Sequence, residues 1–409
     1  MSSDEIAIIG AGLCGLALAL SLHQKSIPCT IYEARPASLN IGGAIMLSPN
    51  ALRILDTLGV YSRIADKGYH FDLLYFRSPD DKPLDTYEFG NKERYGYHGL
   101  RIYRHVLIDE LLAMCAERQI PIHYNRKFIR VVRETASEVT WEFDDGSEQT
   151  GRLLVGADGI HSRVRRYLYP DLEPTFTNAI GVTAAVPMSH LTVPDGYKMP
   201  VTIINPTHGA FVIAPQQPDA SEVLIGRQKR LVDQASRAEW ANLMNNKDWC
   251  IEFLRDGAAD FPPIVQTAVA DIPRDHINLW PFYVVPALPH WMSVEHHCRV
   301  VVLGDAAHAI PPTAGQGINQ GFEDVYTFAA VLDRTARSDK KALPRTLLLW
   351  QSARQARIDR VLDLNRQIDA RRLPESEGGD PAADQAPFDQ QWLFEPDFDQ
   401  MVDEWFTQL

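Results

Sequence analysis

Apolar residues follow two patterns that alternate through the first half of this chain. Short runs at 5–9, 29–33 and 152–155 are rich in apolar and β-branched residues with little polar alternation, which is typical of parallel strands buried on both faces. The segments 13–22 and 104–119 place apolar residues three and four positions apart, which predicts helices. Strands and helices in this order predict an α/β fold built on a parallel sheet.

A different pattern occupies residues 179–231, where apolar and polar residues alternate along 201–205, 210–214 and 222–228. Alternation with a period of two predicts strands that bury one face. We therefore expect a largely antiparallel sheet, inserted as a second domain and covered by a helix at 233–248.

Two further regions have a simple pattern. The segment 128–155 predicts three short strands, at 128–133, 138–143 and 152–155, with the turn Asp144-Asp145-Gly146 between the last two. Residues 344–371 carry apolar side chains at helical spacing, which predicts a long C-terminal helix.

Composition narrows the classes of protein that these elements suit. Of the 409 residues, 45% are hydrophobic and 23% are charged, the balance of a globular protein with a large core. The net charge of −13 and the lack of a dense lysine and arginine run argue against nucleic-acid binding. Five scattered cysteines predict reduced thiols and no metal site, and no apolar stretch is long enough for a membrane span. We expect a cytoplasmic monomer or homodimer.

The first predicted strand runs into a glycine-rich turn that opens a helix. Gly10, Gly12 and Gly15 form the spacing GxGxxG, and Glu33 ends the second predicted strand. In such a unit the glycines allow a tight turn, close approach of a pyrophosphate, and close packing of the helix on the strand. Glu33 is placed to accept hydrogen bonds from a ribose, so we predict a dinucleotide site. The alternative is a turn whose glycines serve packing alone.

Two later stretches place a carboxylate at the end of a predicted strand. Asp158 follows the strand at 152–155, and Asp305 follows a run of three valines. After Asp305 the chain passes two prolines and enters a helix through the glycines at 315–317. Because open α/β sheets bind ligands at the carboxyl ends of their strands, we expect both stretches to border one site.

The stretches GAGLCG, GADGIHSRVR and GDAAHAIPPTAGQGIN occur in this order. Together they resemble the motifs of the group A flavoprotein monooxygenases, the single-component family that includes p-hydroxybenzoate and salicylate hydroxylases. The resemblance implies FAD, with Glu33 on its ribose, Asp305 on its ribityl hydroxyls and Arg104 against the flavin cofactor. The cofactor-binding residues that it implies are Gly10, Gly12, Leu13, Cys14, Gly15, Glu33, Ala34, Arg35, Gly43, Ala44, Arg104, Asp158, Gly159, Asp305, Pro311, Pro312, Gly315, Gln316, Gly317, Ile318 and Asn319.

The patterns and the resemblance together predict a Rossmann-like FAD-binding domain with a parallel sheet. A largely antiparallel substrate domain, covered by helices, is inserted into it, and a helix follows at the C-terminal end. The expected FAD-binding parts are 1–70, 101–177 and 287–335; the substrate parts are 71–100 and 178–286; the C-terminal helix and tail are 336–409.

The implied reaction uses NADPH or NADH to reduce FAD, and molecular oxygen then forms a flavin C4a-hydroperoxide. One oxygen atom passes to an electron-rich aromatic or heteroaromatic small molecule, with hydroxylation as the expected outcome. The chain has no second GxGxxG motif, and relatives in this family take NAD(P)H without a separate nucleotide-binding domain.

Three residues of the predicted substrate domain carry groups that suit a phenolic substrate. Arg227 is a candidate to hold an anion, His208 to take a proton and Tyr283 to relay one. Each also has a simpler explanation: His208 in a hairpin turn, Arg227 on a solvent-exposed strand face, and Tyr283 in ordinary packing.

Other classes of protein share part of the pattern. A flavin halogenase carries the dinucleotide motif but is expected to have a WxWxIP stretch, which this sequence lacks. A flavin oxidase or dehydrogenase is not expected to carry both later motifs. A non-catalytic dinucleotide sensor would not need a second domain large enough to enclose a ligand.

Overall fold

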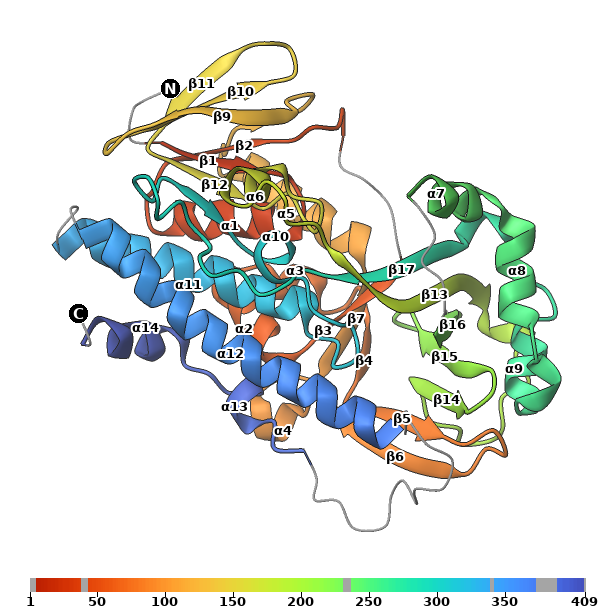
Figure 1. Cartoon of the computed structure of the whole chain (residues 1–409). Helices are drawn as coiled ribbons and strands as arrows, with labels where there is room; N and C mark the ends of the chain where they lie inside the picture. Colours follow the sequence, from red (N-terminus) through yellow and green to blue (C-terminus); the bar gives the residue numbers. More distant parts are fainter. Residues whose placement is uncertain (1–4, 38–42, 231–236, 339–341, 373–387, 408–409) are drawn as a thin grey trace.

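The computed structural model describes residues 5–37, 43–230, 237–338, 342–372 and 388–407. Two sheets dominate it and stand apart in Figure 1: a parallel sheet wrapped by helices, and a larger sheet with helices on its outer side. A small three-stranded sheet lies between them. The predicted combination of a parallel and a largely antiparallel sheet is confirmed.

The parallel sheet has five strands in the order β18-β12-β1-β2-β8. Ile9 lies opposite Gly156, and Gly156 lies opposite Val302, so the three strands that carry them end along one edge. These strands are almost fully buried, which explains their unbroken apolar runs, because a parallel sheet is covered on both faces. The strands are β1 (Ile6–Ile9), β2 (Cys29–Tyr32), β8 (Ile122–His123), β12 (Leu153–Gly156) and β18 (Val300–Val302).

Seven helices pack on or beside this sheet. They are α1 (Leu13–Gln24), α2 (Pro49–Thr57), α3 (Tyr61–Ile64), α5 (Arg104–Glu117), α6 (Arg163–Leu168), α10 (Asp305–His308) and α11 (Gly317–Ser338). Helix α1 contacts both α5 and α11, and α11 also contacts α2. Nearly every residue of α1 is buried, which explains why its apolar residues extend around the whole helix.

A side sheet of antiparallel strands corrects one expectation. Its strands are β9 (Phe128–Glu134), β10 (Val139–Phe143) and β11 (Glu148–Gly151), in the order β11-β10-β9. The turn at 144–146 joins β10 to β11, not to β12 as the sequence pattern predicted. The sequence of β11, EQTG, has no apolar residue that would mark a buried face, because this strand lies at the edge of the sheet.

The larger sheet has seven strands in the order β17-β13-β16-β15-β14-β5-β6. Every neighbouring pair is antiparallel except β14 and β5. The strands are β5 (Leu73–Arg77), β6 (Pro83–Glu88), β13 (Thr175–Pro187), β14 (Val201–Asn205), β15 (Gly209–Pro215), β16 (Glu222–Arg230) and β17 (Asn278–Val284).

The two faces of this sheet have different partners. Val223 and Ile225 point to the face that α8 and α9 cover, and they form a separate hydrophobic core there. Leu224 points to the other face, toward the loop at Gly43. The covering helices are α7 (Arg237–Asn245), α8 (Lys247–Arg255) and α9 (Pro263–Ala268), with 3-10 turns η1 (Met188–His190), η2 (Ala258–Asp260) and η3 (Arg274–His276).

The helix expected at 233–248 is two helices where the structure describes it, and residues 231–236 lie outside the described part. Asn246 separates α7 from α8, because its side chain accepts a hydrogen bond from Trp249 N at 3.1 Å and so caps α8.

The remaining elements join the two large sheets and close the lower side of the molecule in Figure 1. The long C-terminal helix is confirmed, and α14 packs against both it and α11. These elements are β3 (Ala44–Leu47), β4 (Tyr69–Phe71), β7 (Gly99–Tyr103), α4 (Lys92–Tyr95), α12 (Leu343–Arg372), α13 (Gln391–Phe394) and α14 (Phe398–Phe406).

Candidate functional site

The three sequence motifs meet at the carboxyl edge of the parallel sheet. The first follows β1, the second follows β12 and the third follows β18, and these strands are neighbours. A Cβ atom added to Gly10 would lie 2.6 Å from the carbonyl oxygen of Ala157, so the first two motifs are in close contact. A Cβ on Gly304 would lie 3.0 Å from Cys14 Sγ, which brings the first and third motifs together. The edge is therefore one site.

Cys14 gives electrostatic evidence of the same convergence. Burial raises the pKa of its thiol, and the carboxylates of Asp305 and Asp324 raise it further, while Arg104 opposes them. These effects require Asp305 of the third motif, Asp324 of α11 and an arginine of α5 to lie near the helix that the first motif opens. Because the Cys14 thiol stays neutral, its role here is to pack against its neighbours.

The glycines of the first motif divide into two kinds. A Cβ on Gly15 would lie 1.9 Å from the carbonyl oxygen of Gly10, so Gly15 is needed for the helix to pack on the strand. A Cβ on Gly12 would meet no atom within 4 Å. Helix α1 has no side-chain cap, so its first-turn N–H groups remain available to an anion. The open space at Gly12 therefore fits an approaching pyrophosphate.

Glu33 directly follows β2 and places a buried carboxylate beside this turn. It accepts hydrogen bonds from Ala11 N and Arg35 N, each at 2.9 Å. These bonds hold the carboxylate at the rim of the turn, the position expected for a ribose acceptor. Leu13 is buried in the core below, whereas Ala34 and Arg35 are exposed beside Glu33.

Asp158 lies at the start of α6 in the second motif. Its Oδ2 accepts hydrogen bonds from Arg163 N at 2.7 Å and Val164 N at 3.3 Å, whereas Oδ1 is buried without a hydrogen-bond partner. Burial raises the pKa of this carboxyl group, and the hydrogen bonds oppose the shift. Gly159 follows at φ +77°, with open space around its missing side chain. One acceptor at this position therefore remains available.

Asp305 differs from the other carboxylates of the site because its side chain is exposed. It forms no hydrogen bond or ion pair with any residue that the structure describes. The loop that carries it is held by Asp324, whose Oδ2 accepts the Gly304 N–H at 2.9 Å. Arg104 starts α5 nearby, and its N–H donates to Gly43 O at 3.4 Å. A free acceptor on a fixed loop suits the hydroxyl groups of a bound cofactor.

The loop from Pro311 to Asn319 forms the far end of the site. The side chain of Asn319 is buried and binds Ser48 N at 3.0 Å and Gly315 O at 2.7 Å, and the Gln316 side chain is buried too. Both side chains therefore fasten the loop from inside. A Cβ on Gly317, the first residue of α11, would meet no atom within 4 Å. The described exposed or half-exposed positions of this loop include Pro311, Pro312, Gly317 and Ile318.

A buried network of charges supports this loop, and the sequence reasoning did not find it. The side chains of Glu323, Asp324 and Arg354 are 0% exposed. Arg354 Nε donates to Asp324 Oδ1 at 2.8 Å, and Nη1 binds Glu323. Arg357 adds a second cation, 2.6 Å from Glu323 Oε2. The available signal was the pair of acids inside an otherwise apolar helical face and the two arginines three positions apart on the next helix.

The network shifts the pKa of its carboxyl groups. Burial alone would raise the pKa of Glu323, but the attraction of Arg357 and Arg354 outweighs it and lowers the pKa to about 2. The pKa of Asp324 is also lowered against the effect of burial, by His308 and Arg354. His308 is buried and binds Asp324 through Nε2.

Two of the three candidate residues, Arg227 and Tyr283, lie on the helix-covered face of the larger sheet, and His208 lies in the turn between β14 and β15. Arg227 is 1% exposed, binds Asp256 Oδ2 at 3.1 Å and donates to Phe253 O at 3.0 Å. His208 Nε2 lies 2.9 Å from Asp260 Oδ2, and the Tyr283 ring packs with Phe176. His208 and Arg227 therefore bind protein groups beside α8, and Tyr283 packs in the same core. Our proposal for the reaction does not use these three residues.

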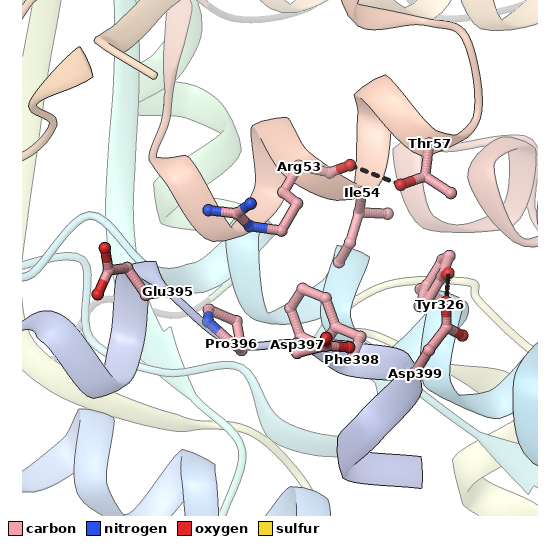
Figure 2. Close-up of a pocket in the computed structure, with 9 residues that line it drawn as sticks. All are labelled: Arg53, Ile54, Thr57, Tyr326, Glu395, Pro396, Asp397, Phe398 and Asp399. Atoms are coloured by element: carbon pink, nitrogen blue, oxygen red, sulfur yellow. Dashed lines mark hydrogen bonds between the residues drawn. The ribbon is translucent and has the colours of Figure 1, made fainter. Parts of the chain in front are cut away.

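A separate pocket of about 480 Å³ lies between α2, α11 and the tail. Figure 2 shows Arg53 and Thr57 on one side of it and Pro396 and Phe398 on the other. It contains none of the residues that the motifs predict. Among the described residues, no group of three histidine, cysteine, aspartate or glutamate side chains is placed to hold a metal. Among the same described residues, no helix is both long enough and apolar enough to cross a bilayer.

The chain is similar to characterised monooxygenases over most of its length. It is 26% identical over 381 residues to hispidin-3-hydroxylase of Neonothopanus nambi, covering 88% of this chain and 87% of the relative. It is 26% identical over 371 residues to 6-hydroxynicotinate 3-monooxygenase of Bordetella bronchiseptica, covering 87% and 90%. It is 27% identical over 398 residues to salicylate hydroxylase of Pseudomonas putida, covering 87% and 82%.

Solved structures share the fold. A salicylate hydroxylase substrate complex superposes with a TM-score of 0.78 at 21% identity, covering 99% of this chain and 98% of that one. HpxO of Klebsiella pneumoniae, complexed with FAD and uric acid, superposes with a TM-score of 0.76 at 22% identity, covering 92% and 90%. A family model described as an FAD binding domain matches residues 4–365. The chain therefore belongs to this FAD-binding family, as its motifs suggested, and is an FAD-dependent monooxygenase of the aromatic hydroxylase type.

Proposed function

We propose that this enzyme consumes NAD(P)H and O₂ and adds one oxygen atom to an electron-rich aromatic or heteroaromatic small molecule, by hydroxylation. The observation that carries the proposal is the single continuous edge formed by the three motifs. It leads from Glu33 past Gly12 and Asp305 to Gly317, and it offers the groups that an extended dinucleotide needs in that order. The names of the relatives supply the aromatic substrate class.

The residues of this edge would hold FAD as follows. Glu33 would bind the adenosine ribose, the backbone at Gly12 and the start of α1 the pyrophosphate, and Asp305 the ribityl hydroxyls. The N-terminus of α11 at Gly317 points N–H groups and positive dipole toward the ring end, where a reduced flavin carries negative charge. FAD, once reduced by NAD(P)H, supplies the activation of O₂.

The protein's own contribution at the ring end is exclusion of water. A Cβ on Gly315 would lie 2.9 Å from Phe89 and 3.1 Å from Met46 Cε, so apolar side chains border this loop directly. Leu224 of the larger sheet approaches the same region at Gly43. A dry site strengthens electrostatic interactions and suppresses loss of activated oxygen to water. The larger sheet and the loop would therefore enclose the substrate between them.

The reductant is proposed to bind without a nucleotide fold of its own. The sequence has one GxGxxG motif, and we assign the turn that it forms to FAD. NAD(P)H would approach the ring end from outside and leave after hydride transfer. NADPH is the reductant that we expect to be preferred.

A substrate screen tests the proposal. Purified enzyme with FAD is mixed with NADPH and O₂ and with each member of a panel of phenols, hydroxypyridines and purines. We expect at least one compound to stimulate NADPH oxidation and to gain the mass of one oxygen atom, with ¹⁸O₂ as the label source. NADPH oxidation that yields only hydrogen peroxide with every compound would instead indicate an oxidase.

Gly12→Ala separates the cofactor role of the first turn from its structural role. The added methyl group meets no protein atom, so we expect the unfolding free energy to change by less than about 0.5 kcal/mol. The methyl group would nevertheless occupy the space proposed for the pyrophosphate, so the affinity for FAD should fall at least about tenfold. Equilibrium FAD titration and urea unfolding measure the two effects.

The matched control is Gly146→Ala, in an exposed turn of the side sheet with equally open space. This variant should bind FAD normally, although its positive φ costs about 1 kcal/mol of stability. Unchanged FAD affinity in Gly12→Ala would contradict the assignment of the turn.

A further inference from the structure

Strand β7 carries a buried arginine, Arg101, that has no role in cofactor binding as described above. Its neighbours Leu100 and Ile102 are 0% exposed and belong to the main core. Because side chains alternate along a strand, Arg101 points to the opposite face. Its cross-strand neighbours on that face are Met46 of β3 and Tyr69 of β4.

Arg101 lacks a partner within the described protein. Its residue is 6% exposed, yet its guanidinium forms no hydrogen bond or ion pair with any described residue, and Nε is buried without an acceptor. Arg165, Arg227 and Arg354 are at least as buried, and each binds carbonyl or carboxylate oxygens. A buried cation without such oxygens costs several kcal/mol, so its presence in a folded protein calls for an explanation.

The apolar surroundings of Arg101 explain why no described neighbour compensates the positive charge of its guanidinium. Burial lowers the pKa of its guanidinium to about 10, and the nearby Tyr103 opposes this shift. The group remains cationic at neutral pH. Tyr69 and Met46 belong to a cluster of aromatic and aliphatic side chains that also includes Leu74 and Ile204. A cation set against such a cluster is complementary to an aromatic ring that bears an anionic group.

Arg101 also lies at the end of the cofactor site where the flavin ring is proposed to bind. Met46 Cε would be 3.1 Å from a Cβ on Gly315, so this face of the small sheet borders the loop proposed for the flavin ring. Along the same face, Tyr103 OH accepts a hydrogen bond from Gln216 of the larger sheet at 2.8 Å. The face of β7 that carries Arg101 therefore lies between the ring-end loop and the larger sheet. Figure 1 shows β7 in the small sheet between the two large sheets.

We propose that Arg101 binds an anionic oxygen substituent, a carboxylate or a phenolate, on the aromatic substrate. The inference rests on the proposed function and narrows its substrate class to aromatic anions. The planar guanidinium offers two parallel N–H donors to a carboxylate, and a bound anion would supply the charge that none of the described residues supplies. A neutral analogue would leave the buried cation unpaired, so the site would discriminate strongly against it.

Ligand binding to the FAD-loaded enzyme tests this assignment without requiring turnover. The probes are salicylate, 4-hydroxybenzoate and 6-hydroxynicotinate, each paired with its primary amide and with its O-methyl ether. Dissociation constants come from the change in the bound-flavin absorption spectrum. For the wild type, we expect at least one anion to bind about ten- to a hundredfold more tightly than its neutral partner. Preference over the amide indicates a carboxylate, and preference over the ether indicates a phenolate.

Two variants decide whether Arg101 causes that preference. In Arg101→Met the preference should disappear while the FAD content stays that of the wild type, and Arg101→Lys should retain part of it. The control Arg166→Met changes an exposed arginine that binds Glu173 at 3.1 Å, and it should behave as the wild type. The proposal is overturned if Arg101→Met keeps the preference, if it loses FAD, or if no anion is preferred by the wild type. Failure of the proposed reaction would appear separately, as absence of oxygen transfer in the substrate screen.

Discussion

Arg354→Met should lower the free energy of unfolding by about 3–5 kcal/mol, because it breaks a buried ion network by removing one partner. Arg354 is 0% exposed and binds Asp324 at 2.8 Å and Gln320 Oε1 at 2.9 Å, as well as Glu323. Without it, Glu323 keeps Arg357 as its cationic partner, whereas Asp324 loses its arginine and keeps only His308. Urea unfolding followed by circular dichroism and tryptophan fluorescence measures the loss.

The matched control lies on the same helix. Arg366 binds Asp363 at 3.4 Å, but its side chain is 76% exposed, so Arg366→Met should change stability by less than about 0.5 kcal/mol. Arg354→Lys should remain destabilised, because a lysine cannot reproduce the forked contacts of the guanidinium. An unfolding midpoint for Arg354→Met equal to that of the wild type would refute the structural role of the network.

Asp305→Ala should leave the fold intact and remove most of the bound FAD. The Asp305 side chain is exposed and has no hydrogen bond to a described residue, so the protein itself loses no contact. The proposed cofactor loses a charged acceptor for its ribityl hydroxyls, which weakens binding about ten- to a hundredfold for each hydrogen bond. The flavin-to-protein ratio after purification and the dissociation constant for added FAD measure the effect.

Two further variants define this result. Asp305→Asn keeps an acceptor but not the charge, so its FAD affinity should lie between those of the wild type and Asp305→Ala. Asp195→Ala removes an exposed carboxylate between η1 and strand β14 of the larger sheet and should retain FAD fully. Full flavin retention in Asp305→Ala would show that the cofactor does not depend on this carboxylate.

Arg354→Met and Asp305→Ala together also test whether the buried charge network is linked to the cofactor site. Asp324 accepts the N–H of Gly304, the residue before Asp305, at 2.9 Å, and it binds His308 at the end of the same loop. Loss of Arg354 removes a direct partner of Asp324. We therefore expect Arg354→Met to weaken FAD binding as well, whereas Asp305→Ala should not affect stability.

The sequence by itself determined the parallel sheet and the motifs that follow its strands. Runs such as 5–9 and 152–155 are apolar on both faces, and only a doubly covered strand accounts for that pattern. Gly15 is equally local in its cause, since a side chain there would meet the carbonyl oxygen of Gly10 in the same strand-to-helix turn. The antiparallel sheet was also predictable, but the edge strand β11 was not, because its sequence, EQTG, has no apolar alternation.

Only the tertiary structure decided which groups face the ring end of the site. Alternation along β16 separates Arg227 from Leu224 but does not say which of the two faces the helices will cover. Asp324 pairs with Arg354, which lies 30 positions further along the chain on another helix. The local spacing of residues does not indicate this contact. In the sequence, Arg101 is likewise only a single polar residue between two apolar neighbours. The structure shows that it is buried and that no described residue binds its guanidinium, and this burial removes the water that would otherwise solvate its charge.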